Sequence, residues 1–114
     1  MRIYQYPRCS TCRKALKFLD GRGIAYESID ITGQPPSRAE LERMLDFQGG
    51  ELKRLFNTSG QVYRELGLSA KLPGLSRDEA LDLLAANGKL IKRPFLLTDA
   101  VGLVGFREAD WAVL

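Results

Sequence analysis

The sequence predicts a single α/β domain over residues 1–114, built from a mixed sheet, flanking helices and one inserted helical segment. Strand and helix signals alternate over 1–33, only helical patterns follow over about 34–88, and strand signals return over 89–114. A chain of 114 residues, 45% apolar and 27% charged, has the size and balance of one globular domain. The expected order is therefore β-α-β, helices, β-β-α, with 1–33 and 89–114 forming the core.

The first third of the chain is interpreted as strand, helix and strand. Residues 2–6 are β-branched and aromatic and stop before a proline. From Ser10 the apolar residues recur at the spacing of a buried helix face, and the pattern ends at Gly21. Residues 25–31 then alternate as a strand does. A β-α-β unit of this length is expected to be right-handed with parallel strands.

Two capping boxes mark the main helices of the insertion. Ser37 is followed three residues later by Glu40, which predicts the start of a helix over 37–47. Ser76 and Glu79 repeat that spacing before a second apolar run.

Shorter helical segments are expected between these helices. Residues 51–56 are interpreted as a short helical stretch and 57–60 as a turn. Three apolar residues after the turn are expected in the core of the insertion: Tyr63, Leu66 and Leu68.

The last part of the chain returns to strands. Residues 93–99 and 102–106 are short apolar runs that predict an antiparallel hairpin. A terminal helix is expected over 107–114, with Trp111 packed on the sheet.

Charge and composition exclude several functions. The net charge of +3 is mild and spread along the chain, so we expect no direct nucleic-acid binding. The absence of histidine excludes Ser-His and Cys-His catalytic pairs, and two cysteines alone do not complete a structural zinc site. We therefore expect no metal and no bound cofactor. With no membrane-span pattern and no leader, a cytoplasmic protein is expected.

Both cysteines fall in one short stretch, YPRCSTCRKAL (6–16). Four interpretations are open: a redox couple, half of a zinc site, a structural disulfide, or two inert buried thiols. Cys9 is expected in the loop and Cys12 in the first helical turn, a junction that favours exposure. The helix N-terminus and three basic neighbours would lower the pKa of Cys9. Cys12 lies close enough to resolve an adduct on Cys9. A disulfide that closes a loop of two residues would add little stability, so thiol chemistry is favoured over a structural disulfide. The basic neighbours are Arg8, Arg13 and Lys14.

Several segments run in the same order as in a known family. They are YPRCSTCRKAL (6–16), PPSRAEL (35–41), NTSGQVYRELGL (57–68), IKRPFLLTD (91–99) and GFREADW (105–111). With these segments the chain resembles the arsenate reductase-like (ArsC) family, in the branch of Spx- and MgsR-type regulators and their reductase-like relatives. The resemblance covers essentially the whole chain and implies a thioredoxin-like fold with a helical insertion.

The resemblance also implies roles for single residues. Cys9 matches the catalytic cysteine, and Arg93 and Arg107 match two of three arginines that hold the oxyanion. Asn57 stands where the third arginine is expected, and Arg54 lies one helical turn away. Pro94 matches a cis-proline beside the active cysteine. Ser10 and Thr11, which follow Cys9, complete the candidate anion-binding residues.

Three functions follow as hypotheses. The first is a thiol-dependent oxidoreductase resembling arsenate reductase, acting on a small anionic or thiol substrate with glutathione and glutaredoxin, or thioredoxin, as electron donor. The second is a redox-sensing regulator of the Spx type that binds the RNA polymerase alpha subunit. The third is a protein whose thiols sense oxidants without turnover. A monomer is expected in each case.

Overall fold

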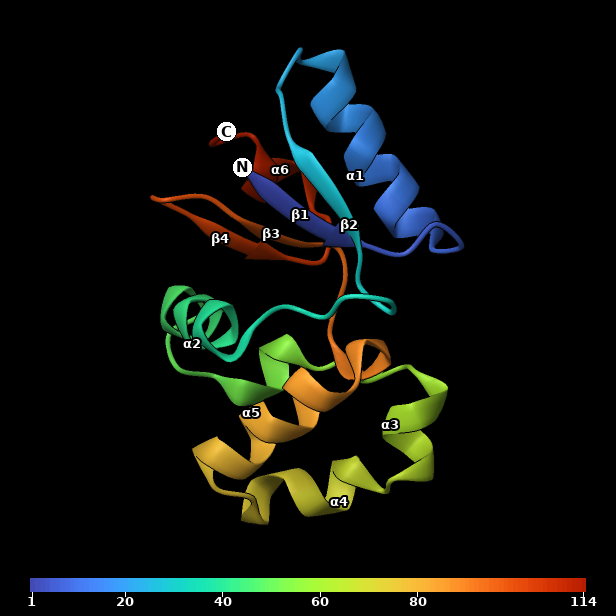
Figure 1. The fold of residues 1–114 in the computed structure, drawn as a ribbon, viewed down its shortest axis with the longest axis vertical. Helices are drawn as coiled ribbons and strands as arrows, with labels where there is room; N and C mark the ends of the chain where they lie inside the picture. Colours follow the sequence, from blue (N-terminus) through green and yellow to red (C-terminus); the bar gives the residue numbers. More distant parts are fainter.

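The computed structural model describes residues 1–114 and contains one four-stranded sheet in the order β2-β1-β3-β4 (Figure 1). Its strands are β1 (Arg2–Gln5), β2 (Glu27–Asp30), β3 (Phe95–Leu97) and β4 (Gly102–Val104). β1 and β2 are parallel, whereas β3 is antiparallel to both β1 and β4. The predicted mixed sheet, including its terminal hairpin, is confirmed.

One face of the sheet is covered by α1 (Ser10–Gly21) and α6 (Glu108–Trp111) (Figure 1). Side chains alternate between the faces of a strand, so Ile3 of β1 and its partner Leu96 of β3 both point to this side. The predicted packing of Trp111 on the sheet is confirmed. We call this cluster of five buried residues the α1-side core: Ile3, Ala15, Leu19, Leu96 and Trp111.

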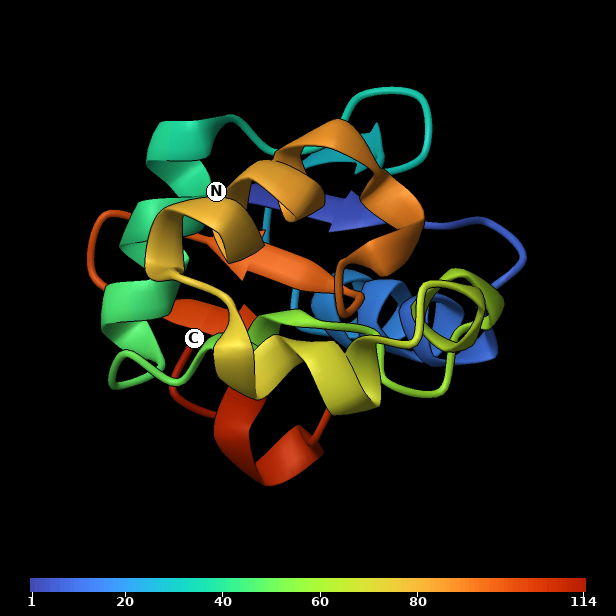
Figure 2. The same ribbon diagram turned by 90° about the horizontal axis from the view of Figure 1, so that it is seen from below.

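The opposite face is covered by the helices of the middle of the chain (Figures 1 and 2). These are α2 (Arg38–Phe47), α3 (Gln61–Glu65), α4 (Leu68–Lys71) and α5 (Arg77–Ala86), joined by the 3-10 turns η1 (Leu52–Leu55), η2 (Leu72–Gly74) and η3 (Gly88–Leu90). No helix of the structure combines the length and apolar character needed to cross a membrane.

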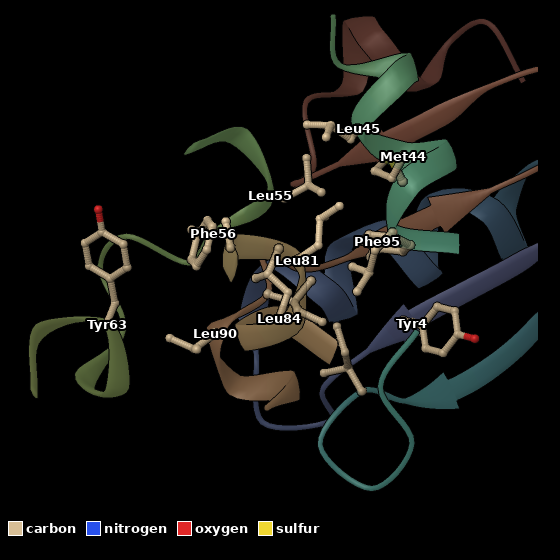
Figure 3. Close-up of a cluster of buried hydrophobic side chains, with 14 of the residues drawn as sticks. Tyr4, Met44, Leu45, Leu55, Phe56, Tyr63, Leu81, Leu84, Leu90 and Phe95 are labelled. Carbon is tan, nitrogen blue, oxygen red and sulfur yellow. The ribbon is translucent and has the colours of Figure 1, made fainter. Parts of the chain in front are cut away.

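A larger core lies between these helices and the sheet, and we call it the helical-side core (Figure 3). It contains 17 buried residues and joins Tyr4 and Phe95 of the sheet to Leu81 and Leu84 of α5. The inserted helices and the sheet therefore share one apolar cluster.

Both predicted capping boxes are present. The Glu40 N–H donates to Ser37 Oγ at 3.1 Å, and the Ser37 N–H donates to Glu40 Oε1 at 3.0 Å. Ser76 and Glu79 make the same pair of bonds at 3.1 and 3.0 Å. Each box satisfies two backbone donors that have no partner within the helix, which explains why α2 and α5 begin where they do.

The short helical stretch predicted over 51–56 is present as the 3-10 turn η1 (Leu52–Leu55), and Phe56 beyond it pairs with Ile91 as an isolated antiparallel bridge. One expectation for the insertion was wrong. Leu66 is 39% exposed rather than part of the core. The chain reverses at Gly67, whose φ of +63° ends α3 and breaks the helical spacing on which that expectation rested. Tyr63 and Leu68 are buried as expected.

Candidate active site

Cys9 caps the N-terminus of α1. The chain turns after β1, where the Cys9 N–H donates to the Tyr6 carbonyl at 3.0 Å. Cys9 is extended (φ −88°, ψ 116°), and its Sγ accepts the N–H of Cys12 at 3.4 Å. A side chain that accepts this bond occupies the place of the usual serine or aspartate cap. The thiol therefore lies at the positive end of a 12-residue helix.

The surroundings of Cys9 favour its thiolate. Partial burial opposes ionisation, but hydrogen bonds from Cys12, together with the hydrogen bond and positive charge of Arg93, outweigh it and lower the pKa of Cys9. Arg13 turns its guanidinium to the Pro7 carbonyl, at 3.1 Å. Cys9 is half-buried and is thus both ionisable and reachable.

Cys12 lies in a different environment, although only two residues separate the thiols. It is 0% exposed, which corrects the expectation that the junction would expose both cysteines. Its Sγ accepts the Tyr6 N–H at 3.5 Å. Burial, with the neighbouring Cys9 as a further cause, raises the pKa of Cys12 to about 12. Cys12 is therefore a buried thiol of low reactivity next to the accessible, reactive thiol of Cys9.

A hollow of about 510 Å³ opens in front of Cys9 and brings most of the candidate residues together. Thr11, Asn57, Arg93 and Arg107 line it with Cys9. The remaining three candidates do not line it: Ser10 is exposed at the start of α1, and Cys12 and Pro94 are buried.

Tyr6 connects the parts of this site. Its ring supports the Arg93 guanidinium at 5.0 Å from the ring centre, and its backbone bonds to both cysteines. The peptide bond between Arg93 and Pro94 is cis, the isomer that the resemblance implies. Tyr6 was not a candidate in the sequence, because its contact with Arg93 joins positions far apart in the chain.

Arg107 and Arg54 both line the hollow, and each has a carboxylate nearby. Arg107 is 83% exposed, with its Nε 4.0 Å from Asp110. Arg54 donates from Nε to Glu51 at 2.9 Å. Arg54 therefore lies at the hollow that Asn57 also lines, although its charge is shared with a neighbour.

Polar lining residues that sequence reasoning missed include Gln48, Lys92 and Asp110. Gln48 donates from Nε2 to the Gly102 carbonyl at 3.0 Å, which joins the end of α2 to β4. The only signal for Lys92 was its position directly before Arg93. No group of three or more acidic, cysteine or histidine side chains converges as a metal site would require.

Comparison with known proteins identifies the family of this chain. The sequence model of the ArsC family matches residues 4–114. The chain belongs to the ArsC family. The resemblance drawn from its segments is thereby confirmed.

Relatives within and around the ArsC family carry different names. The chain is 48% identical to the uncharacterized protein YusI of Bacillus subtilis (strain 168), over 96% of this chain and 97% of that protein. It is 33% identical to an arsenate reductase of Neisseria meningitidis, over 92% of this chain and 89% of that protein. It is 27% identical to the global transcriptional regulator Spx of Streptococcus agalactiae, over 95% of this chain and 77% of that protein.

The fold is likewise that of ArsC-related proteins. The crystal structure of a putative ArsC family related protein from Bacteroides fragilis superimposes with a TM-score of 0.94, at 45% identity, over 98% of this chain and 94% of that one. The thioredoxin-like α/β sheet with a helical insertion is thus shared with a solved ArsC-type structure.

Proposed function

We propose that this ArsC-family chain is a thiol-dependent oxidoreductase with Cys9 as nucleophile and Cys12 as resolving thiol. The observation that carries the proposal is the position of Cys9, whose Sγ accepts an N–H of α1 beside Arg93 at the base of an open polar hollow. Such an arrangement stabilises the thiolate that attacks disulfides and electrophilic oxyanions.

For a disulfide substrate the chemistry has two steps. The Cys9 thiolate attacks one sulfur, a mixed disulfide forms, and the other sulfur leaves as a thiolate that takes a proton from water. Cys12 then loses its proton and attacks Cys9 Sγ, which releases the second thiol. The two cysteines lose two electrons, and the substrate gains them. Because Cys12 is buried, we expect it to be reached through Cys9 rather than by an external thiol.

For an oxyanion such as arsenate, Cys9 would displace one oxygen as water and form a bond from its sulfur to arsenic. A second thiol would then attack Cys9 Sγ, form a disulfide, and leave the electron pair of the sulfur–arsenic bond on the released, reduced oxyanion. Arg93 and Arg107 would hold the anion, with Asn57 as a neutral hydrogen-bonding group. Thr11 lines the hollow at the N-terminus of α1, and Ser10 lies beside it outside the lining. Glutathione with glutaredoxin, or thioredoxin, would reduce the disulfide and complete the cycle.

Turnover assays of single-cysteine variants test this proposal. Purified protein is given a neutral disulfide or arsenate, with glutathione–glutaredoxin or with thioredoxin as donor. We expect Cys9→Ser to lose all turnover. We expect Cys12→Ser to form the adduct on Cys9, seen by mass spectrometry, and to release product only when an external thiol is supplied. Undiminished turnover by Cys9→Ser would contradict the proposal.

A second candidate is a redox-controlled regulator of the Spx type. The observation that favours it is the similarity to Spx together with the C-x-x-C pair. Oxidation of Cys9 and Cys12 would then change binding to the RNA polymerase alpha subunit. Titration of the reduced and oxidised protein with that subunit tests it. Equal affinity in both states, or no binding in either, would exclude redox-controlled binding.

A further inference from the structure

We propose that the hollow in front of Cys9 binds an organic disulfide that carries carboxylates, with Lys92 holding one carboxylate away from the reacting sulfur. This rests on the proposed thiol function and specifies its substrate class. The argument uses the size of the hollow, the charges that line it and the anchoring of Lys92.

The hollow is large for a lone oxyanion. At about 510 Å³ it falls within the range of roughly 300–1,000 Å³ typical of sites for small organic ligands. A second hollow, of about 200 Å³, shares Asn57 and Arg93 with the first and adds Lys89. The half-buried Val104 and Phe106 supply apolar surface within the first hollow, which an organic substrate would contact.

The lining carries more positive charge than a single small anion needs. Four cations line the first hollow, and Asp110 is its only acidic residue. Arg54 is paired with Glu51, and Arg107 lies near Asp110. Lys92 and Arg93 have no carboxylate partner in the structure, although Arg93 already acts on Cys9. Lys92 is therefore the free cation available to a second anionic group. The four cations are Arg54, Lys92, Arg93 and Arg107.

Lys92 is exposed, is fixed at its backbone, and has its stem next to Gly105. Its N–H donates to the Leu55 carbonyl at 2.8 Å, which fixes the start of the side chain. The stem lies over Gly105, where an added Cβ would come within 2.9 Å of Lys92 Cε and 3.9 Å of Nζ.

Gly105 is itself fixed, so the surface beneath the lysine is rigid. Its N–H donates to the Pro94 carbonyl at 2.9 Å, and its carbonyl accepts the Trp111 indole N–H at 3.0 Å. The glycine has φ +69°, which disfavours any side chain there. The ammonium is therefore held beside the hollow over a backbone that leaves room for it.

The reaction keeps atoms and electrons in balance. The Cys9 thiolate attacks the near sulfur of the disulfide, the bond between the two sulfurs breaks, and the departing thiolate takes a proton from water. The half retained on Cys9 keeps its carboxylate at Lys92, so the charge contact persists in the mixed disulfide.

Three symmetrical disulfides of similar length test the proposal on Cys12→Ser protein, which stops at the mixed disulfide. They are dithiodipropionate with two negative charges, hydroxyethyl disulfide with none, and cystamine with two positive charges. Mass spectrometry of the Cys9 adduct gives the rate constants. We expect the dianion to react fastest and the dication slowest.

Substitution of Lys92 sharpens the test. We expect Lys92→Gln to lower the ratio of the dianion rate to the neutral rate by about three- to tenfold. Lys71→Gln, which removes one positive charge on α4, is the control and should leave that ratio unchanged. Using the ratio cancels any change in the reactivity of Cys9 itself.

Each outcome bears on a different claim. A dianion no faster than the neutral disulfide, or equal ratios for Lys92→Gln and Lys71→Gln, would overturn the charge assignment and leave the thiol function standing. Failure of Cys9 to react with any of the three disulfides would overturn the proposed function and this inference together.

Discussion

The two faces of the sheet differ in how they are built and in what they bring to the site. The α1-side core has five buried residues, and its helix α1 is capped at the N-terminus by the reactive thiol of Cys9. The helical-side core has 17 buried residues and supports the segment that carries Arg54 and Asn57. The smaller core thus positions the nucleophile, while the larger one supports the opposite wall of the hollow.

This difference indicates that the stability of the fold and the reactivity of the Cys9 thiol can be changed separately. Lys92 and Arg93 come from the segment just before β3. Lys92 donates its N–H to the Leu55 carbonyl of the helical-side core, and Arg93 lies over the Tyr6 ring and acts on Cys9. A change within one core should therefore affect stability, whereas a change at the contacts around Arg93 should affect the thiol. The predictions below test this separation.

The largest effect is expected at Trp111, the biggest side chain of the smaller core. Trp111→Ala should lower the free energy of unfolding by about 3–5 kcal/mol, because a cavity forms and the Gly105 carbonyl loses its donor. Urea denaturation measures this loss. Val113→Ala, at a side chain that is 68% exposed, is the control and should change stability by less than about 0.5 kcal/mol. Similar losses for both variants would contradict the importance of this core.

Glu40 tests the link between β1 and the helical side. It accepts hydrogen bonds from Tyr4 Oη at 2.7 Å, the Ser37 N–H at 3.0 Å and Arg2 Nη1 at 3.2 Å. Glu40→Gln should cost about 1.5–3 kcal/mol at neutral pH, because a charged acceptor becomes neutral. Asp46→Asn, an exposed carboxylate on the same helix, should cost much less.

The cost at Glu40 should depend on pH. Burial raises the pKa of Glu40, but hydrogen bonds from Tyr4, Ser37 and Arg2 outweigh it and lower that pKa in the folded state. Its contribution to stability is therefore complete above the unfolded pKa of about 4.3 and is lost as the pH falls through the folded pKa. The difference between Glu40→Gln and the natural chain should shrink on acidification. A difference that is constant from pH 7 to strong acid would exclude the ionised carboxylate as its cause.

The smallest expected change in energy is at Tyr6, yet it should act on the thiol. Tyr6→Leu removes the ring under Arg93, a contact worth roughly 0.5–1 kcal/mol, and should raise the pKa of Cys9 as the guanidinium loses its position. Tyr6→Phe keeps the ring and should behave as the natural chain does. Alkylation rates against pH measure both variants. Equal profiles for the leucine and phenylalanine variants would show that the ring does not position Arg93.

Local features of the fold were predictable from the sequence. The capping boxes at Ser37 and Ser76 depend on residues three positions apart, and both helices begin where those pairs indicate. The strand alternation and the cysteine spacing are equally local. The burial of Leu66 was misjudged because the pattern does not reveal that Gly67 adopts positive φ.

The site was predictable only in part, because its walls come from distant segments. Cys9, Arg93 and Arg107 were identified through motifs, but Lys92 and Gln48 carry no local pattern that points to the hollow. The burial of Cys12 is also a long-range effect. It depends on how α1 packs on β1, where the Tyr6 N–H meets the sulfur.

The central claim is that two thiols in one loop are held in opposite states, and pH-dependent alkylation of the folded natural chain tests it most directly. We expect labelling of Cys9 alone, with a half-maximal rate below the ordinary thiol pKa of about 8.5, and labelling of Cys12 only after unfolding. A Cys9 transition at or above about 8.5, or equal labelling of both cysteines in the folded protein, would contradict the claim.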